Sequence, residues 1–548
     1  MKGQLSSAHI DAINRRRRII VNFDVISADG ARFATKEIER LVEWKFMFAD
    51  EPGTHIDSVY WSWGEGHQAP YPSEVLPLYD SPGFKKWADD GVNIVQVFLD
   101  AAKQRGIESF FSYRINGSDN DLGPVAEIPM KEAHPDWLIH TWNANGYWNF
   151  ALEGVHEYKL SILREAAEDY DFDGIELDFA RVCPVLPPGH QWEYRDRLTD
   201  FIRATRAMLQ EVARKRGRPL LLAARIPENL EGCHFDGIDP ETWAQEELLD
   251  IFVMGCRSFD VDIPAFRRIT EGTNIKLYPC IDDHHASDGY QWPPIEVMRG
   301  VVTNWYQQGA DGVQTFNFAH ATPEGTDSVV GQMYLEKGWH THRQAYQEIG
   351  DSEVIKHKNK IFVVQRRGGG HGTTVIPNPE DWSTPRFMYF NTNMFGQLPA
   401  PLDNDGKVDT LLTIAVADDV SAETDRVNQI TLRLLLSDPE AENLSDDDRL
   451  QQVTVATIGH PDTLQNNPAA KGIEDQIEVR VNNILLETPK VEEGWLVFAV
   501  QPKFLAVGDN LVGVRVTGSG KGIPAPMRST EVQHQILIEK LEVHLKYR

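Results

Sequence analysis

Hydrophobic and polar positions alternate in a regular rhythm over the first two thirds of the chain. Between about residues 18 and 348, short apolar runs of strand length are separated by stretches with apolar residues at helical spacing, as in 157–169 and 191–215. This alternation is typical of repeated β–α units around a parallel sheet. The predicted strands are 19–23, 57–61, 108–113, 174–178, 220–225, 251–254, 275–280 and 312–316.

Two segments within this region are alike. Residues 172–175 and 310–313 both place an Asp-Gly pair between a helical stretch and a strand. Glycine at that point permits the positive φ of a helix-to-strand turn. The repeat supports strands four and eight of one (β/α)8 barrel.

Beyond about residue 352 helical spacing becomes rare and short strand-like runs replace it. Five such runs are 411–416, 430–435, 477–481, 495–500 and 511–516. With turn clusters such as 508–510 between them, they indicate an antiparallel sandwich or jelly roll. Because 548 residues exceed what one core normally fills, we expect an α/β TIM barrel over residues 1–350 and a β-sandwich accessory domain over 351–548.

The fourth predicted strand carries acidic residues on one face. Alternation along a strand turns Ile175 and Leu177 one way and Glu176 and Asp178 the other. In a TIM barrel, inward residues at the carboxyl end of a strand enter the active-site mouth. Asp178 is therefore the first predicted catalytic residue, as nucleophile or base. Glu176, lying deeper, is expected to orient an arginine or raise the pKa of a neighbour.

A structural role for Asp178 is the alternative to catalysis. Its carboxylate would then pair with Arg114, Arg181 or Arg225 in a network that only stabilises the barrel. The sequence leaves both interpretations open.

Other predicted strands also end in carboxylates. Glu228 follows the fifth strand and is the expected general acid, although it would also be an ordinary loop residue. Asp282 and Asp283 follow the seventh strand and compete for the same role, the alternative being to cap the next turn. Asp24 and Glu65 are lesser candidates.

Aromatic, cationic and amide side chains near the strand ends are expected to bind substrate. Flat rings would stack on sugars, and amides would hold hydroxyl groups. Arginines, among them Arg257, would bind an anionic sugar or balance the inner carboxylates. The predicted binding residues are Glu176, Arg181, Arg114, Arg225, Trp61, Trp63, Glu65, Trp142, Trp148 and Asn317, with Tyr147 as a further aromatic.

The composition of the chain argues against several classes of binding partner. A net charge of −28 argues against binding to nucleic acid or an anionic membrane, and no apolar stretch of about 18 residues predicts a membrane span. The four cysteines lack paired spacing and are expected to be reduced core thiols. The absence of a secretory apolar region predicts a cytoplasmic protein, although a secreted protein without its signal would look the same.

Cofactors are not expected. Metal binding by His284 and His285 with Asp282 or Asp283 is an alternative. Two features argue against it, because adjacent histidines usually point apart and no metal-binding spacing appears. His320 is expected to be a hydrogen-bonded loop residue. The glycine-rich segment 368–372 lacks the ending of a phosphate loop.

Three segments resemble a known family. Residues 101–108, 134–138 and 170–181 resemble, in that order, the motifs of family-10-like glycosyl hydrolases, which are bacterial TIM-barrel proteins. The strand before Asp178 also looks like that of the α-amylase, α-glucosidase and α-galactosidase groups, which implies a nucleophile at Asp178. It is close to the chitinase strand as well, but Ala180 stands where that family has its catalytic glutamate.

The sequence therefore predicts a glycoside hydrolase that cleaves an oligosaccharide or polysaccharide with paired carboxylates. An exo-acting enzyme for an anionic or sulfated sugar is the finer expectation. The alternatives are a non-hydrolytic carbohydrate-binding protein and a metal-dependent sugar isomerase, epimerase or lyase.

Overall fold

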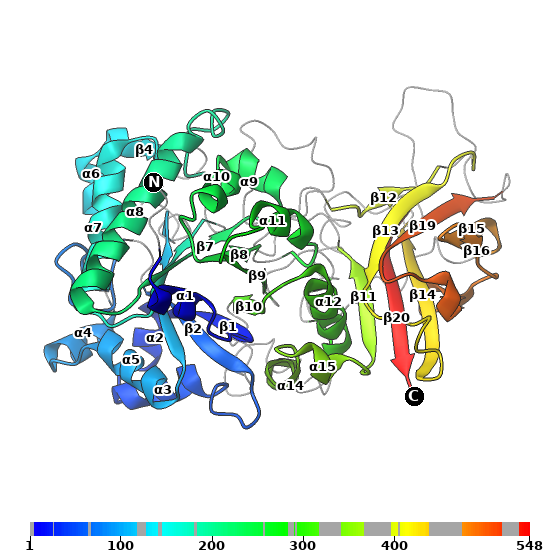
Figure 1. Cartoon of the computed structure of the whole chain (residues 1–548), viewed down its shortest axis with the longest axis horizontal. Coiled ribbons are helices and arrows are strands. Elements are labelled where there is room, and N and C mark those ends of the chain that lie inside the picture. Colours follow the sequence, from blue (N-terminus) through cyan, green and yellow to red (C-terminus); the bar gives the residue numbers. More distant parts are fainter. Residues whose placement is uncertain are drawn as a thin grey trace.

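The computed structural model describes most of the chain. The described residues are 5–25, 27–63, 67–79, 81–117, 128–140, 145–179, 184–255, 258–282, 290, 293–316, 341–365, 396–403, 406–437, 474–517 and 536–548. They form a barrel surrounded by helices and, beside it, a β-rich unit that appears in yellow to red in Figure 1.

Eight parallel strands close into the barrel in the order β1-β10-β9-β8-β7-β6-β3-β2. They are β1 (Ile19–Val25), β2 (Ile56–Trp63), β3 (Glu108–Arg114), β6 (Gly174–Asp178), β7 (Leu221–Ile226), β8 (Ile251–Met254), β9 (Lys276–Ile281) and β10 (Val313–Phe316). Each overlaps the strand predicted at its place, so the predicted TIM barrel is confirmed.

Helices precede, connect and follow these strands. They are α1 (Ser7–Ile13), α2 (Ser27–Arg32), α3 (Ile38–Phe46), α4 (Pro82–Asp89), α5 (Ile94–Gln104), α6 (Pro129–Ala133), α7 (Glu153–Asp169), α8 (Arg195–Arg216), α9 (Leu230–Asp236), α10 (Pro240–Gln245), α11 (Ile263–Ile269), α12 (Ile295–Gln308), α14 (Thr341–Glu348) and α15 (Ser352–Ile355). A short hairpin, β4 (Leu138–Ile139) with β5 (Tyr147–Trp148), lies between β3 and α7. Among the described residues no helix is both long and apolar enough to cross a membrane.

The glycines of the Asp-Gly repeat serve a different purpose from the predicted one. Neither Gly174 nor Gly312 is among the glycines with positive φ; that conformation occurs at the helix ends, at Gly217 and Gly309. A Cβ on Gly174 would lie 2.2 Å from the Phe110 ring. One on Gly312 would lie 2.3 Å from a backbone oxygen. Close packing, and not turn geometry, therefore explains the glycine in both repeats.

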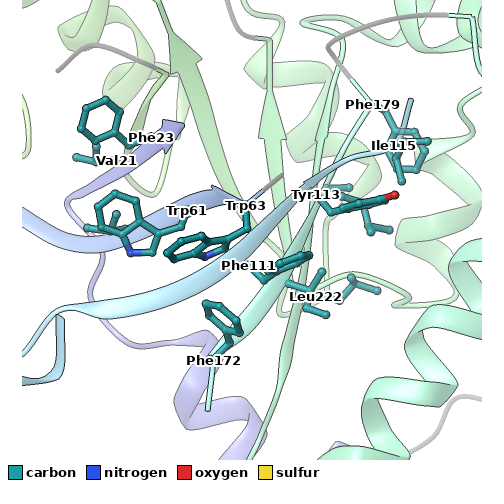
Figure 2. Packing of buried hydrophobic residues seen from close by; sticks show 14 of the residues in the cluster. Val21, Phe23, Trp61, Trp63, Phe111, Tyr113, Ile115, Phe172, Phe179 and Leu222 are labelled. Carbon is teal, nitrogen blue, oxygen red and sulfur yellow. The ribbon is translucent and has the colours of Figure 1, made fainter. Parts of the chain in front are cut away.

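Two hydrophobic layers hold the barrel. Outward-facing residues of the strands pack against the helices, and Figure 2 shows part of this layer around Trp61, Trp63 and Phe111. A smaller cluster fills the interior, where the rings of Tyr60 and Phe110 stack at 4.2 Å. Helix α1 contributes Ile13 to this inner cluster and so closes the N-terminal end of the barrel.

Two antiparallel sheets around one shared hydrophobic core form the C-terminal unit, as predicted. One sheet has the order β11-β20-β14-β18-β17, with β12 beside β20, and the other β13-β19-β15-β16. The strands are β11 (Lys360–Val364), β12 (Ala400–Pro401), β13 (Thr410–Val416), β14 (Val427–Ser437), β15 (Ile477–Val481), β16 (Ile484–Leu485), β17 (Lys490–Glu492), β18 (Trp495–Ala499), β19 (Gly508–Val516) and β20 (Leu537–Tyr547).

Strand β11 joins the two units. Its alternate side chains enter different cores: Phe362 and Val364 belong to the sandwich core, whereas Ile361 and Val363 pack on the barrel. Helix α12 approaches this strand so closely that a Cβ on Gly300 would lie 2.2 Å from the Ile361 oxygen. The barrel and the sheets therefore share a packed wall.

Candidate functional site

The carboxyl end of the barrel carries a row of alternating charges. Arg114, Asp178 and Arg225 are register partners on neighbouring strands β3, β6 and β7, so their side chains share one face of the sheet. All three residues are at most 2% exposed. Alternation along each strand, as predicted, turns these charged side chains toward the barrel interior.

Asp178 is held by Arg225 in a two-pronged contact. Arg225 Nε donates to Asp178 Oδ1 at 3.1 Å and Nη2 donates to Oδ2. The Arg225 guanidinium also lies 3.9 Å from the centre of the Phe316 ring on β10. This geometry fixes the orientation of the Asp178 carboxylate. The ion pair with Arg225, which was predicted for a purely structural Asp178, is therefore present, and it also positions the Asp178 carboxylate.

A second pair extends the row. Arg114 Nη2 donates to Asp24 Oδ1 at 2.5 Å, and Asp24 lies near the end of β1. Burial by itself would lower the pKa of the Arg114 guanidinium, but the charges of Asp24 and Asp178 raise it overall. The arginine therefore remains a cation between two carboxylates.

Glu176 lies one layer deeper, where polar side chains from three other strands meet it. Asn22 Nδ2 and Ser112 Oγ both donate to its Oε2 at 2.6 Å, and Gln314 Nε2 donates to Oε1 at 2.8 Å. Burial raises the pKa of the Glu176 carboxyl, with the Arg225 charge opposing and the Asp178 charge adding to that effect. Its place below Asp178 suits the predicted supporting role.

Asn22, Ser112 and Gln314 were not among the predicted site residues. Each has the inward position of its strand, so the alternation that singled out Asp178 also identifies them. Their common partner could not be read from the sequence, because β1 and β10 become neighbours only when the barrel closes.

Two further predicted carboxylates are buried at the same end of the barrel. Glu228 follows β7 and is fully buried beside the end of β8, where a Cβ on Gly255 would lie 3.3 Å from Glu228 Cβ. Its backbone oxygen accepts a hydrogen bond from Asp262 N at 2.9 Å. Asp282 directly follows β9 and is also fully buried. The carboxyl ends of β1, β6, β7 and β9 thus each supply a buried acid.

Trp61 and Trp63 do not face this site. Both are at most 1% exposed within the layer between strands and helices, with the Phe98 ring of α5 at 4.9 Å and 5.1 Å from their rings. Figure 2 shows them side by side among other core residues. Because Tyr60 and Ser62 take the inward positions of β2, the tryptophans point outward, and the prediction that they stack on sugars is wrong.

Trp148 and Tyr147 are also unavailable to a sugar. Each is 1% exposed. The Trp148 ring packs against Tyr158 at 5.2 Å, and the Lys159 ammonium lies 4.8 Å from its centre. The hairpin tryptophan therefore stabilises the contact between α7 and the barrel, and its predicted role in substrate binding is wrong.

Several predicted residues lie outside the described part of the chain. These are Asp283, Arg181, Glu65, Trp142 and Asn317, together with Arg257, His284, His285, His320 and the segment 368–372. Among the residues that are described, no group of three or more His, Cys, Asp or Glu side chains is arranged to hold a metal ion. Cys233 and Cys280, the two described cysteines, are buried free thiols.

Comparison with known proteins found only distant structural similarities. No family model and no curated protein matches the chain, so the resemblance to family-10-like glycosyl hydrolases stays a prediction. Similar solved structures include α-L-fucosidase isoenzyme 2 from Paenibacillus thiaminolyticus, at 13% identity over 62% of this chain and 49% of that chain, with a TM-score of 0.38. The GH20 exo β-N-acetylglucosaminidase from Vibrio harveyi is 13% identical over 60% of this chain and 54% of its own, with a TM-score of 0.34.

A third similar structure is the PgaB (BpsB) glycoside hydrolase domain from Bordetella bronchiseptica, 12% identical over 57% of this chain and 97% of its own, with a TM-score of 0.36. The chain spans about half the length of the first two structures. At these identities and scores the similarities bear on neither substrate nor mechanism.

Proposed function

We propose that this protein hydrolyses a glycosidic bond at the carboxyl end of its barrel. The observation that carries the proposal is the concentration of buried acid there. Asp24, Glu176, Asp178, Glu228 and Asp282 are five carboxyl groups, each at most 6% exposed, against the two buried guanidinium groups of the row. Burying so many like groups is costly, and such clusters in a barrel mouth are characteristic of catalytic sites.

An excess of carboxylates suits this reaction. Glycosidic cleavage passes through a transition state with positive charge on the sugar ring, and most such enzymes use two carboxyl groups. Asp178, held at both oxygens by Arg225, has the fixed orientation needed of a nucleophile or base. Glu228 or Asp282 is the proposed general acid, and Glu176 positions Asp178 and Arg225 from below.

The expectation of an anionic or sulfated substrate rests on four arginines, of which Arg181 and Arg257 lie outside the described residues. Arg114 and Arg225 are both engaged by carboxylates, Asp24 and Asp178 respectively. A sulfate or a second carboxylate would have to compete with these contacts. The two described arginines therefore favour a neutral sugar in this proposal.

A hydrolysis screen tests the proposal. The full chain is incubated with a panel of 4-nitrophenyl glycosides and neutral oligosaccharides, with and without a chelator, and released sugar is measured. We expect turnover that survives chelation and falls by about 10³-fold or more in Asp178→Asn. Glu228→Gln and Asp282→Asn then distinguish the two candidates for the acid.

Asp173→Asn is a matched control. Asp173 immediately precedes the same strand, at its other end, and pairs with Arg218 at 3.0 Å. Its variant should retain turnover. If the wild-type protein hydrolyses no sugar of the panel, the proposal is contradicted. Sugar binding that Asp178→Asn weakens would then support a carbohydrate-binding barrel, and activity lost on chelation would support the metal-dependent alternative.

A further inference from the structure

A cleft of about 670 Å³ lies between the barrel and the β-rich unit. The barrel side consists of the segments after β7 and β8 and of helices α11 and α12. Strands β11 and β13 contribute to the other side, and Figure 1 shows them facing these helices. A volume of this size is within the range of sites for small ligands, and the cleft is separate from the row of charges inside the barrel.

Helix α12 presents one continuous face to this cleft. Val301, Asn304, Trp305 and Gln308 all line it, and their spacing places them on one side of a helix. The amide oxygens Asn304 Oδ1 and Gln308 Oε1 are buried and, within the described part of the chain, accept no hydrogen bond. Leaving a buried acceptor unsatisfied costs free energy, so a ligand whose hydroxyl groups reach these oxygens when the side-chain amides turn toward the cleft would be favoured.

Asn304 links the two units, and its side-chain oxygen accepts no hydrogen bond from the described residues. Its Nδ2 donates to the backbone oxygen of Ala415 on β13 at 3.0 Å. The end of β11 is fastened as well, because Gln365 Oε1 accepts from Ser258 Oγ at 2.9 Å and from Phe259 N at 2.5 Å. The walls of the cleft are therefore held in place before any ligand arrives, which lowers the entropic cost of binding.

Charge at the cleft disfavours an anion. The lining includes Glu231, Asp260, Asp262 and Asp509 but only one cation, Arg268. Arg268 is exposed and makes no hydrogen bond or ion pair with the described residues. A metal ion is also disfavoured, since no described group of three potential ligands is arranged for one. A neutral ligand rich in hydroxyl donors fits the surplus of carboxylate and amide acceptors.

We propose that this cleft is a second carbohydrate-binding site, which takes a neutral oligosaccharide through Asn304, Gln308 and Arg268. The site adjoins the loop of the proposed general acid, because Asn229, Leu230 and Glu231 line the cleft and directly follow Glu228. A sugar held here would lie on the outer side of that loop. Binding in the cleft does not depend on hydrolysis and is measurable without it.

The test uses the full chain carrying Asp178→Asn, so that no sugar is consumed. Maltoheptaose, cellohexaose, laminarihexaose and mannohexaose are titrated separately by calorimetry, and hydrogen exchange is followed in segments 259–268 and 301–308. We expect at least one of these sugars to bind and to protect both segments.

Adding Arg268→Ala and Gln308→Ala should weaken this binding about tenfold or more, as expected for the loss of two hydrogen bonds. Neither side chain makes a hydrogen bond within the described residues, so the fold should be retained. Gln307→Ala is the matched control, because Gln307 is exposed on the same helix and does not line the cleft.

Two results would overturn the proposal. One is that no sugar of the panel protects the two segments, and the other is that the double variant binds as tightly as the Gln307→Ala control. Neither result bears on hydrolysis, which is measured separately with Asp178 intact.

Discussion

The two ends of the barrel bury similar charged pairs in different settings. At the N-terminal end Arg17 Nε and Nη2 each donate to Glu108 at 2.6 Å, a two-pronged contact like that of Arg225 with Asp178. Ser58 Oγ adds a third hydrogen bond to Glu108. Three backbone oxygens in or just after α1 also accept from Arg17, so this pair is part of the closure of the barrel.

Near the same end Asp250 is surrounded by donors. Arg206 donates to both its oxygens at 2.7 Å, His9 Nε2 lies 2.9 Å from Oδ1, and Leu222 N donates to Oδ2. Among the described residues at the carboxyl end, in contrast, five buried carboxyl groups outnumber the two arginines that pair with them. A buried ion pair is therefore no evidence of catalysis by itself; an excess of acid at the carboxyl end is the distinguishing feature.

Replacing one arginine at each end of the barrel should give the largest difference between a pair that positions a catalytic carboxylate and a pair that only stabilises the fold. Arg225→Met leaves Asp178 without its positioning partner, so we expect kcat of the folded protein to fall by about 10³-fold. Arg17→Met should cost about 3–5 kcal/mol of unfolding free energy and leave kcat per folded molecule unchanged. Steady-state kinetics and urea denaturation of both variants measure this, and equal losses of kcat would erase the distinction.

Asp250 should show a dependence on pH that belongs to the closed end. Burial alone would raise the pKa of this carboxyl, but the Arg206 charge and the hydrogen bonds from His9 and Arg206 lower it well below its usual range. The stability it contributes is therefore fully present above the unfolded pKa of about 3.9 and is lost as pH falls toward the folded value. Asp250→Asn should cost about 3–5 kcal/mol at neutral pH.

Urea denaturation of wild type and Asp250→Asn from neutral to acidic pH checks this sign. The difference between the two proteins should shrink on acidification. A difference that grows as pH falls would show that the network does not favour the ionised carboxylate.

Trp63→Ala tests whether Trp63 stabilises the core between strands and helices or binds substrate in the barrel interior. Because Trp63 is 1% exposed among core residues, we expect a loss of about 3–5 kcal/mol in unfolding free energy. KM for any cleaved sugar should be unchanged. Thermal unfolding and initial rates measure the two effects; a large rise in KM with intact stability would return Trp63 to the binding site.

Glu176→Gln should have the smallest effect on the unfolding free energy, and this effect should depend on pH in the opposite direction to that of Asp250→Asn. Burial raises the pKa of Glu176, so the wild-type protein loses stability as pH rises above the unfolded value of about 4.3 and toward the folded one. The variant lacks this loss and should gain stability relative to wild type over that interval. At acidic pH, where Glu176 is protonated in the wild-type protein, the different hydrogen bonds of the glutamine side chain should change the unfolding free energy of Glu176→Gln by about 1 kcal/mol relative to wild type.

Denaturation at about pH 4 and about pH 8 measures the relative stability of Glu176→Gln. A difference that does not change between these two values would mean that Glu176 titrates as in the unfolded chain. The results for Asp250 and Glu176 together show whether the pKa of a buried carboxyl group is lowered at one end of the barrel and raised at the other.

The amino-acid sequence by itself determined the strands and the inward face of each. Alternation is a local property of a strand, so Asp178 and Glu176 could be placed from their own neighbours. The same rule applied to β2 turns Trp61 and Trp63 outward, because Tyr60 and Ser62 take the inward positions. A tryptophan near a strand end is therefore a binding residue only where its face of the strand points inward.

Only the tertiary structure decided which groups meet. Glu176 gathers Asn22, Ser112 and Gln314 because β1 and β10 close the barrel, and the cleft exists because α12 packs on β11. These contacts join residues far apart in the sequence, and no periodic pattern records them. Local periodicity sets the direction of a side chain, whereas its partner depends on how distant elements pack.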